Sequence, residues 1–250
     1  MFGNVSRLRS RLRGGSSGGG SAPAFSLPTD IAGLKLWLDA SDSVVSSGGA
    51  VSQITDKSGN SHHATQSTTG SKPTTGAVTV NGLNAVTFDG TNDTLAVASG
   101  IYPVTNGAST VLSVYIMRNT NSTVLTGRDA SNRYRPLHES STTVRYCSGD
   151  TTGVVGTIAS DTINPHIIGH TGDSSLFKGI YDGVPTLDAT RTPFVSTAFH
   201  IGSNNNAGNF ANMDFCECVI YDSELSMTDL NNVGNYLADK WGVSWTDAFF

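Results

Sequence analysis

The stretch from Thr110 to Met117 reads TVLSVYIM and decides the fold class. β-branched and aromatic residues fill it, and such residues favour an extended strand over a helix. Shorter stretches of the same kind lie at Leu34 to Leu38, Ala85 to Phe88, Thr123 to Thr126, Thr142 to Cys147, Val154 to Ala159, His166 to His170, Leu176 to Tyr181, Phe199 to Gly202 and Phe215 to Tyr221. They recur at roughly ten-residue spacing with Gly, Asn or Asp between them, a rhythm typical of an all-β sandwich or barrel.

The composition agrees with short strands joined by turns. The chain has 250 residues, of which 28 are Gly and 14% are charged. Globular proteins carry about 25% charged residues, and helical bundles and coiled coils are richer still in Glu, Lys, Leu and Ala. A bundle or coiled coil is therefore disfavoured, and the length allows one large all-β domain or two small ones.

One helix is predicted near the end of the chain. Ser226 is followed three residues later by Asp229, a pair that resembles a capping box. Apolar residues then recur at helical spacing, at Leu230, Val233, Leu237 and Trp241. Gly242 follows where a left-handed helix end is expected. We therefore expect a helix of about four turns that packs its apolar face on the β domain.

Residues 1–24 differ from the rest of the chain. They begin with a basic arm whose alternating residues are Arg7, Leu8, Arg9, Arg11, Leu12 and Arg13. In an extended chain this alternation places the Arg side chains on one side, and such a segment can add to the sheet edge of a partner protein. Gly14 to Ser21 (GGSSGGGS) has the composition of a flexible tether and also of an artificial fusion linker. We divide the chain into this arm and tether, residues 1–24, and a β domain, residues 25–250.

Charge and hydropathy disfavour several partner classes. The formal net charge is −5, and the chain beyond the basic arm is more acidic still. Nucleic acid is not expected as a partner, because phosphate contacts need clustered Lys and Arg. No run approaches the roughly 18 apolar residues of a membrane span, and no apolar segment follows the basic arm as in a secretory signal.

Several motifs recur in a characteristic order. They are Gly33 to Asp42 (GLKLWLDASD), Ile54 to Asn60 (ITDKSGN), His63 to Gln66 (HATQ), Lys72-Pro73, Asn81 to Asp93 (NGLNAVTFDGTND), Ile220-Tyr221, Ser223 to Ser226 and Lys240 to Val243 (KWGV). In this order and spacing the chain resembles the laminin-G-like domains of the concanavalin A-like jelly-roll superfamily, of the kind found in bacterial and phage proteins.

This resemblance implies two packed antiparallel sheets, a jelly-roll sandwich, with one C-terminal helix. It also implies binding, often to glycans, rather than one fixed chemistry, because fold alone does not define function. The region from Gly127 to Ala198 matches the pattern only loosely. Ligand-binding residues are therefore not carried over there.

Paired carboxylates of the kind used by glycosidases are not recognised in the sequence. Some jelly-roll relatives cleave polysaccharides with an acid and a base or nucleophile at fixed separation, often about 5–9 Å. The glutamates here are Glu139, Glu217 and Glu224, and none belongs to an E-x-D-x-x-E arrangement. Glu217 is expected to face solvent. No catalytic residue is assigned, and we expect a non-enzymatic protein.

Calcium is the one metal for which the sequence offers candidate ligands. The candidates lie in turn motifs, at Asp39, Asp56, Asp89 and Asp93. Hard oxygen ligands of this kind suit Ca²⁺, but Asp side chains also cap their own turns. We favour turn capping, so no cofactor is predicted.

The cysteine and histidine residues do not form a recognisable site. Cys216 and Cys218 lie two apart on a predicted strand, where they are expected to share a face as buried, unreactive thiols. With Cys147 they make an odd set, which is no disulfide framework. His62 and His63 are adjacent and would point to opposite faces of a strand. We interpret His63 as structural.

Aromatic side chains outside the regular core pattern are candidate sugar platforms, because ring faces can stack on apolar patches of sugars. The glycan-binding candidates are Tyr102, Arg133, Tyr134, Phe194 and Phe210. The Arg residue would suit an acidic glycan. Ordinary loop packing is the alternative for each of them.

Together these observations lead us to expect a phage virion surface protein. The N-terminal arm would anchor it to other virion proteins, as a head decoration, fibre or tail component. The jelly roll would face outward on the virion surface, form a homo-oligomer and bind a host-surface glycan or receptor. Two alternatives remain open: a secreted or cell-surface bacterial carbohydrate-binding module, and a polysaccharide-degrading hydrolase with an unrecognised site.

Overall fold

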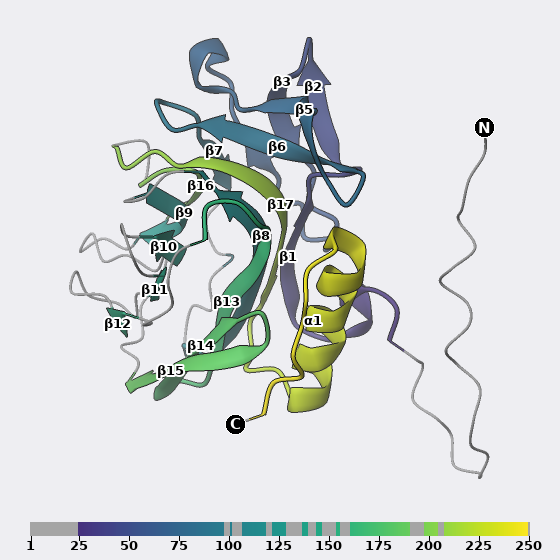
Figure 1. Ribbon diagram of the computed structural model, residues 1–250, viewed down its shortest axis with the longest axis vertical. Coiled ribbons are helices and arrows are strands. Elements are labelled where there is room, and N and C mark those ends of the chain that lie inside the picture. The colour runs from purple at the N-terminus through teal and green to yellow at the C-terminus, as the bar shows by residue number, and fades with distance from the viewer. Residues whose placement is uncertain are drawn as a thin grey trace.

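The chain forms a layered β-sandwich with one long helix on its outer side. The structure is a computed structural model. It describes residues 25–97, 101, 107–118, 122–128, 137–139, 144–146, 154–155, 161–190, 198–204 and 208–249. Figure 1 shows helix α1 (Met227–Trp241) on one side of the central strands and the second sheet on the other. The basic arm, Arg7 to Arg13, lies outside the described residues.

The first sheet is built around the strand that the sequence marks most strongly. That strand is β8 (Ser109–Met117), and all nine of its residues are buried. From one edge the strand order is β15 (Val184–Thr190), β14 (Leu176–Tyr181), β13 (His166–Gly172), β8 and β17 (Asn212–Tyr221). Beyond β17, its two halves pair with β1 (Leu34–Asp39) and β6 (Leu83–Asp89), and β5 (Thr74–Val80) follows β6.

The second sheet consists of shorter strands. Its order is β2 (Val44–Ser47), β3 (Ala50–Ile54), β4 (Ala64–Thr65), β7 (Leu95–Val97), β16 (Ala198–Ile201), β9 (Ser122–Arg128), β10 (Leu137–Glu139), β11 (Val144–Tyr146) and β12 (Val154–Val155). Two 3-10 turns are also present: η1 (Pro28–Asp30) precedes β1, and η2 (Thr69–Ser71) lies between β4 and β5. The sheets meet at one edge, where Ala50 pairs with Thr74. All described pairings are antiparallel, as the sandwich prediction requires.

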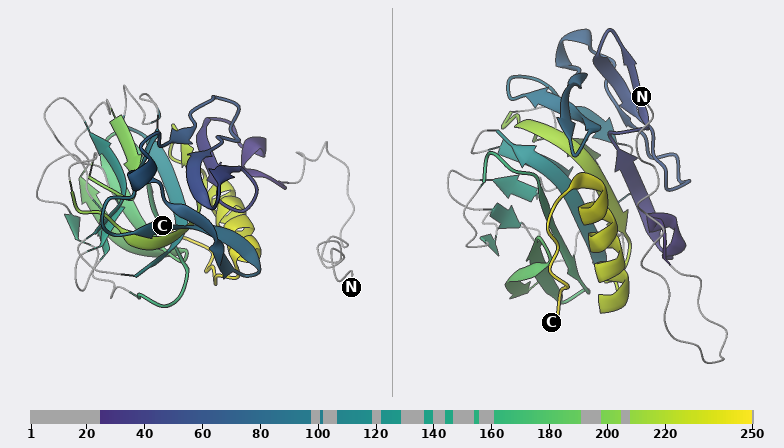
Figure 2. Two further views of the ribbon diagram at one scale, coloured as in Figure 1. Left: turned by 90° about the horizontal axis from the view of Figure 1, so that it is seen from above. Right: turned by 45° about the vertical axis from the view of Figure 1, so that its right-hand side comes forward.

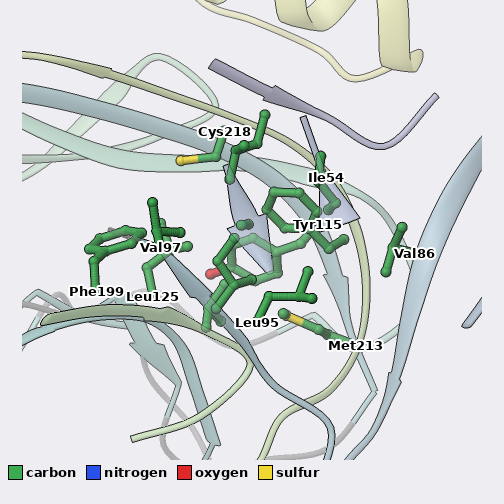
Figure 3. Close-up of a cluster of buried hydrophobic side chains, with 14 of the residues drawn as sticks. Ile54, Val86, Leu95, Val97, Tyr115, Leu125, Phe199, Met213 and Cys218 are labelled. Carbon is green, nitrogen blue, oxygen red and sulfur yellow. The ribbon is translucent and has the colours of Figure 1, made fainter. Parts of the chain in front are cut away.

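The main hydrophobic core fills the space between the two sheets. Figure 3 shows side chains from both sheets meeting there: Ile54, Val86, Leu95, Val97, Tyr115, Leu125, Phe199, Met213 and Cys218. Alternate residues of β8 belong to it, since Val111, Tyr115 and Met117 face this core while Leu112 and Val114 face the helix. Two-sided burial explains why apolar residues occupy both faces of this strand.

A second core lies between the first sheet and the helix. The Ser226 side chain accepts a hydrogen bond from the Asp229 amide, and Gly242 ends the helix with φ of 69°. The predicted stripe is buried: Leu230, Val233, Leu237 and Trp241. Both views in Figure 2 keep the helix along the first sheet. The predicted fold class, an all-β antiparallel sandwich with one C-terminal helix, is confirmed.

The strands of the second sheet were less predictable. The sequence patterns indicate no strand at β2, β3, β4 or β7 of this sheet, nor at β5 or β15 of the first sheet. The predicted strands over Thr142 to Cys147 and Val154 to Ala159 are described only as β11 and β12. In β1 the expected alternation is also interrupted. The pairing shifts between Leu34 and Leu36, so that Leu34 packs in the helix-side core while Leu36 and Leu38 face the inter-sheet core.

Candidate functional site

Two polar regions compete for a functional role, and the first is enclosed beneath the helix. Glu217 is fully buried on β17. Its Oε1 accepts hydrogen bonds from Trp37 Nε1 at 2.6 Å and from the Tyr236 hydroxyl at 3.0 Å. Its Oε2 accepts one from Trp241 Nε1 at 2.6 Å and contacts Lys240 Nζ at 2.7 Å. The prediction that Glu217 faces solvent is therefore wrong.

A bulge in β17 produces this burial. The pairing with β8 shifts between Phe215 and Glu217, so one extra residue is inserted. As a result Cys216 and Glu217 both face the helix layer, whereas Cys218 faces the inter-sheet core. The prediction that Cys216 and Cys218 share a face is wrong for this reason. Both thiols are buried, and burial raises the pKa of each, which keeps them protonated and unreactive.

Asp39 completes the buried charge network. It lies opposite Glu217 in the pairing of β1 with β17 and is itself fully buried. Its Oδ2 contacts the ammonium groups of Lys57, at 2.9 Å, and Lys240. Its Oδ1 accepts a hydrogen bond from the Ser41 hydroxyl at 2.6 Å. We call Asp39, Glu217, Lys240, Trp37 and Trp241 the enclosed cluster.

The two carboxylates of the enclosed cluster are shifted in opposite directions. Burial acts to raise the pKa of Asp39, but hydrogen bonds from Lys240 and Ser41 outweigh it and lower the pKa to about 2. Burial and the Asp39 charge raise the pKa of Glu217. Such a divergent pair can serve acid–base catalysis. Here, however, both side chains are sealed from solvent and their oxygens are occupied by protein donors, so a substrate has no access to them.

The other aspartates considered as calcium ligands bind their own turns. Asp56 accepts hydrogen bonds from the backbone amides of Ser58 and His62 in its own turn, and one from the Trp37 amide, which links that turn to β1. Asp89 accepts from the Thr91 and Asn92 amides, and Asp93 from the Asp89 amide. These are the contacts of turn capping. Within the part of the chain that the structure describes, no three His, Cys, Asp or Glu side chains gather as a metal site would require.

The second polar region is an exposed row across the second sheet. Cross-strand pairing places Val45 beside Gln53, Gln53 beside Thr65, and Thr65 beside Ala96. Their sequence neighbours Val44, Ile54, Ala64 and Val97 pack in or against the inter-sheet core. Because successive strand residues point to opposite faces, the first row faces outward. It crosses four strands, about 14 Å at a strand spacing of about 4.8 Å.

Three hollows follow this row. One of about 580 Å³ is lined by Val45, Ser52, Gln53, Thr65, Gln66, Ser67, Thr68, Lys72 and Ala96. A second, of about 150 Å³, shares Gln66 and Thr68 with the first and adds Ser71, Asn92, Thr94 and Phe210. A third, of about 420 Å³, shares Val45 with the first and adds Asp42, Ser43, Val44, Thr55 and Lys57. We call the three hollows together the trough.

The sequence candidates for glycan binding are only partly placed. Phe210 is partly exposed and lines the small hollow of the trough. Tyr102, Arg133, Tyr134 and Phe194 lie outside the described residues. The sequence analysis missed Gln53 and Thr65, because they belong to short Ser/Thr-rich strands. The only available signal was that each of them adjoins an apolar residue: Gln53 precedes Ile54, and Thr65 follows Ala64.

Comparisons with known proteins support the sandwich fold. No family model matches the chain, and no curated protein matches it. Domain 4 of AbnA, a GH43 extracellular arabinanase from Geobacillus stearothermophilus, solved with arabinotriose, is 16% identical with a TM-score of 0.61 and covers 81% of this chain and 97% of its own. The sialidase of Trypanosoma rangeli is 13% identical with a TM-score of 0.56, over 84% of this chain and 33% of its own.

A GH54 α-L-arabinofuranosidase gives a similar result. It is 16% identical with a TM-score of 0.57, over 77% of this chain and 51% of its own. This chain therefore spans about a third to a half of the two larger enzymes and nearly all of the arabinanase domain. At these identities the likeness shows the β-sandwich fold.

The same comparisons correct the functional prediction. The prediction of a non-enzymatic phage virion surface protein is wrong, because the similar structures are glycoside hydrolases or a domain of one. The exclusion of an enzymatic role is overturned by the same finding. Over the described residues, no helix has both the length and the apolar character needed to cross a membrane.

Proposed function

We propose that the chain is an oligosaccharide-binding β-sandwich of a polysaccharide-degrading hydrolase, with the trough as its binding surface. The observation that carries this proposal is the outward row of Val45, Gln53, Thr65 and Ala96 with the hollows along it. An elongated surface that crosses four strands suits several linked sugars rather than a single small molecule.

The chemistry of the trough fits sugar hydroxyl groups. Hydroxyl and amide side chains dominate its lining, and such groups can both donate and accept hydrogen bonds. The trough also holds two apolar side chains: Val45, which is half exposed, and Phe210, which lines the small hollow. These apolar surfaces can contact the C–H faces of sugar rings. A few polar groups set among apolar ones are typical of ligand sites.

The comparison with the arabinanase domain supports a binding role. That domain was solved with arabinotriose, and this chain covers 97% of it. The two larger neighbours, a sialidase and an arabinofuranosidase, are covered over a third to a half of their length. A sandwich of this size is thus a recurring part of glycoside hydrolases, which supports placing the chain in polysaccharide breakdown.

The laminin-G-like resemblance is a finer part of the proposal. Its motifs converge on the enclosed cluster, since GLKLWLDASD supplies Asp39 and KWGV supplies Lys240, while ITDKSGN supplies Lys57, which contacts Asp39. The Asn-Gly turn of a fourth motif joins them, because Asn81 Nδ2 donates to the Lys240 carbonyl at 2.9 Å. This convergence supports a structural rather than a ligand-binding role for the shared motifs.

Binding and hydrolysis can be tested together. Calorimetric titration of the full chain with arabinotriose and with oligosaccharides of other sugars should give saturable binding to at least one. The double variant Gln53→Ala/Thr65→Ala should weaken that binding at least about fivefold, since each lost hydrogen bond contributes about 0.5–1.5 kcal/mol. Asp239→Ala, on the exposed side of α1, is the matched control. Reducing-sugar release from the same oligosaccharides measures hydrolysis directly. Absence of binding to the whole series, or undiminished binding by the double variant, would contradict the proposal.

A further inference from the structure

One side chain of the trough is a cation that pairs with no carboxylate among the residues that the structure describes. The chain has five lysines. Four of them form ion pairs: Lys35 with Asp222, Lys57 with Asp39 and Asp42, Lys178 with Glu224, and Lys240 with Asp39 and Glu217. The fifth, Lys72, pairs with no carboxylate of the described residues, and it lines the 580 Å³ hollow.

The backbone around Lys72 is held in place. Lys72 directly follows η2, and the carbonyl of Ser71 accepts a hydrogen bond from the Thr94 amide at 3.2 Å. On the other side, the carbonyl of Pro73 accepts one from the Val51 amide at 2.8 Å. Both bonds tie the turn to the region of β3 and β7, which form the floor of the trough. Lys72 itself is partly buried, and a segment whose backbone is held on both sides carries it at the edge of the hollow.

The charge of Lys72 is not balanced inside the hollow that it lines. The other eight lining residues of that hollow are uncharged. In the adjoining hollow Lys57 and Asp42 neutralise each other at 2.8 Å. A lysine held in neutral polar surroundings attracts an anion, and its ammonium group acts as a compact charge. The missing counter-charge is therefore expected from the ligand.

We infer that the trough selects an oligosaccharide that carries a carboxylate, with Lys72 as the group that binds the acid. This inference rests on the proposed function and adds the chemical class of its ligand. The carboxylate can belong to a uronic acid within a chain or to a sialic acid at its end. Both supply the same chemistry, a carboxylate among sugar hydroxyls.

The experiment compares acidic with neutral ligands. Calorimetric titrations at low salt use trigalacturonate against galactotriose for the internal acid, and 3′-sialyllactose against lactose for the terminal one. Wild type should bind at least one acidic ligand about fivefold tighter than its neutral counterpart, the size expected of one exposed ion pair. Raising the salt concentration should reduce that preference, because salt screens exposed charges.

Matched variants assign the preference to Lys72. Lys72→Gln should abolish the preference for the acidic ligand, and Lys72→Arg should retain it. Lys35→Gln removes the same charge from β1, away from the trough, and should behave as wild type. Thermal melting of each variant confirms folding.

The outcomes separate this inference from the proposed function. If wild type binds acidic and neutral ligands equally, or if Lys72→Gln keeps the preference, the inference is wrong while glycan binding stands. If wild type binds none of the four ligands and no member of the wider series, the proposed function fails, and this inference fails with it.

Discussion

The enclosed cluster and the trough are both polar, but they differ in what their polar groups contact. In the enclosed cluster, Asp39 and Glu217 are fully buried and meet protein donors. In the trough, Gln53 and Thr65 face outward beside open hollows. The difference shows that the fully buried charges are balanced by protein groups, while the accessible trough, which we propose as the binding surface, is lined mostly by uncharged groups.

The physical reason lies in desolvation. A buried carboxylate is tolerated only when donors replace its lost water, and satisfying it fully leaves nothing for a ligand. Neutral hydroxyl and amide groups cost less free energy to desolvate than a carboxylate does. They can therefore exchange bound water for sugar hydroxyls. Perturbed pKa values often mark functional sites, but structural ion-pair networks perturb them as well. The following predictions test this division between the two regions.

The largest effect is expected from breaking the enclosed cluster. Lys240→Met leaves Asp39 and Glu217 side by side without the cation that contacts both. Removing one partner of a buried ion pair costs about 3–5 kcal/mol. Denaturant unfolding should show this loss in the free energy of unfolding, while glycan affinity of the folded fraction stays unchanged. If the variant is as stable as wild type, the enclosed cluster does not stabilise the fold.

A smaller loss of stability is expected at the contact between the helix and the C-terminal tail. A Cβ added at Gly234 would lie 2.1 Å from the Trp245 ring, so the two must move apart. Overpacking of this kind costs about 1–3 kcal/mol. Gly234→Ala should therefore lower the free energy of unfolding by that amount, measured against Asp239→Ala on the exposed side of the helix. Equal stability of the two variants would contradict the tail packing.

The next effect concerns the trough and leaves stability unchanged. Phe210→Ala removes the aromatic wall of the small hollow. Aromatic contacts contribute about 0.5–1.5 kcal/mol, so oligosaccharide affinity should fall about threefold to tenfold. Phe249→Ala removes an aromatic ring that is 76% exposed in the C-terminal tail, and it should bind as wild type. If both variants bind equally well, Phe210 makes no contact with the ligand.

The smallest effect is a pH dependence at the first sheet. Burial acts to lower the pKa of His166, but Asp182 and Asp161 outweigh it and raise the pKa above 6.5. The stabilisation by protonated His166 is complete below the unfolded pKa of about 6.5 and is lost as the pH rises through the folded value. His166→Gln should remove this part of the decline in stability above pH 6.5. If the free energy of unfolding depends on pH in the same way in the variant and in wild type, His166 does not make this contribution.

The elements that could be predicted are those whose own residues determine their secondary structure, without help from distant segments. Strand β8 is apolar on both faces, and α1 carries its cap, its apolar stripe and its terminal Gly242 within seventeen residues. The ends of such elements depend on local chemistry, and their existence depends on periodicity. For these reasons the sandwich with a C-terminal helix follows from pattern alone.

The parts that escaped prediction depend on distant segments. The bulge in β17 is set by its pairing with β8, and it alone turns Glu217 toward the helix. The trough combines β2, β3, β4 and β7, whose outward residues look like ordinary turn composition one strand at a time. Lys72 stands out only when the partners of every other lysine are known.

If the two regions differ as described, a glycan binds to the trough and not at the enclosed cluster. An amide NMR titration of the isotope-labelled full chain with its tightest-binding oligosaccharide tests this most directly. Saturable shifts are expected at Gln53, Thr65 and Gln66, with the indole signals of Trp37 and Trp241 unmoved. Shifts centred on those indoles, with the trough amides silent, would contradict it.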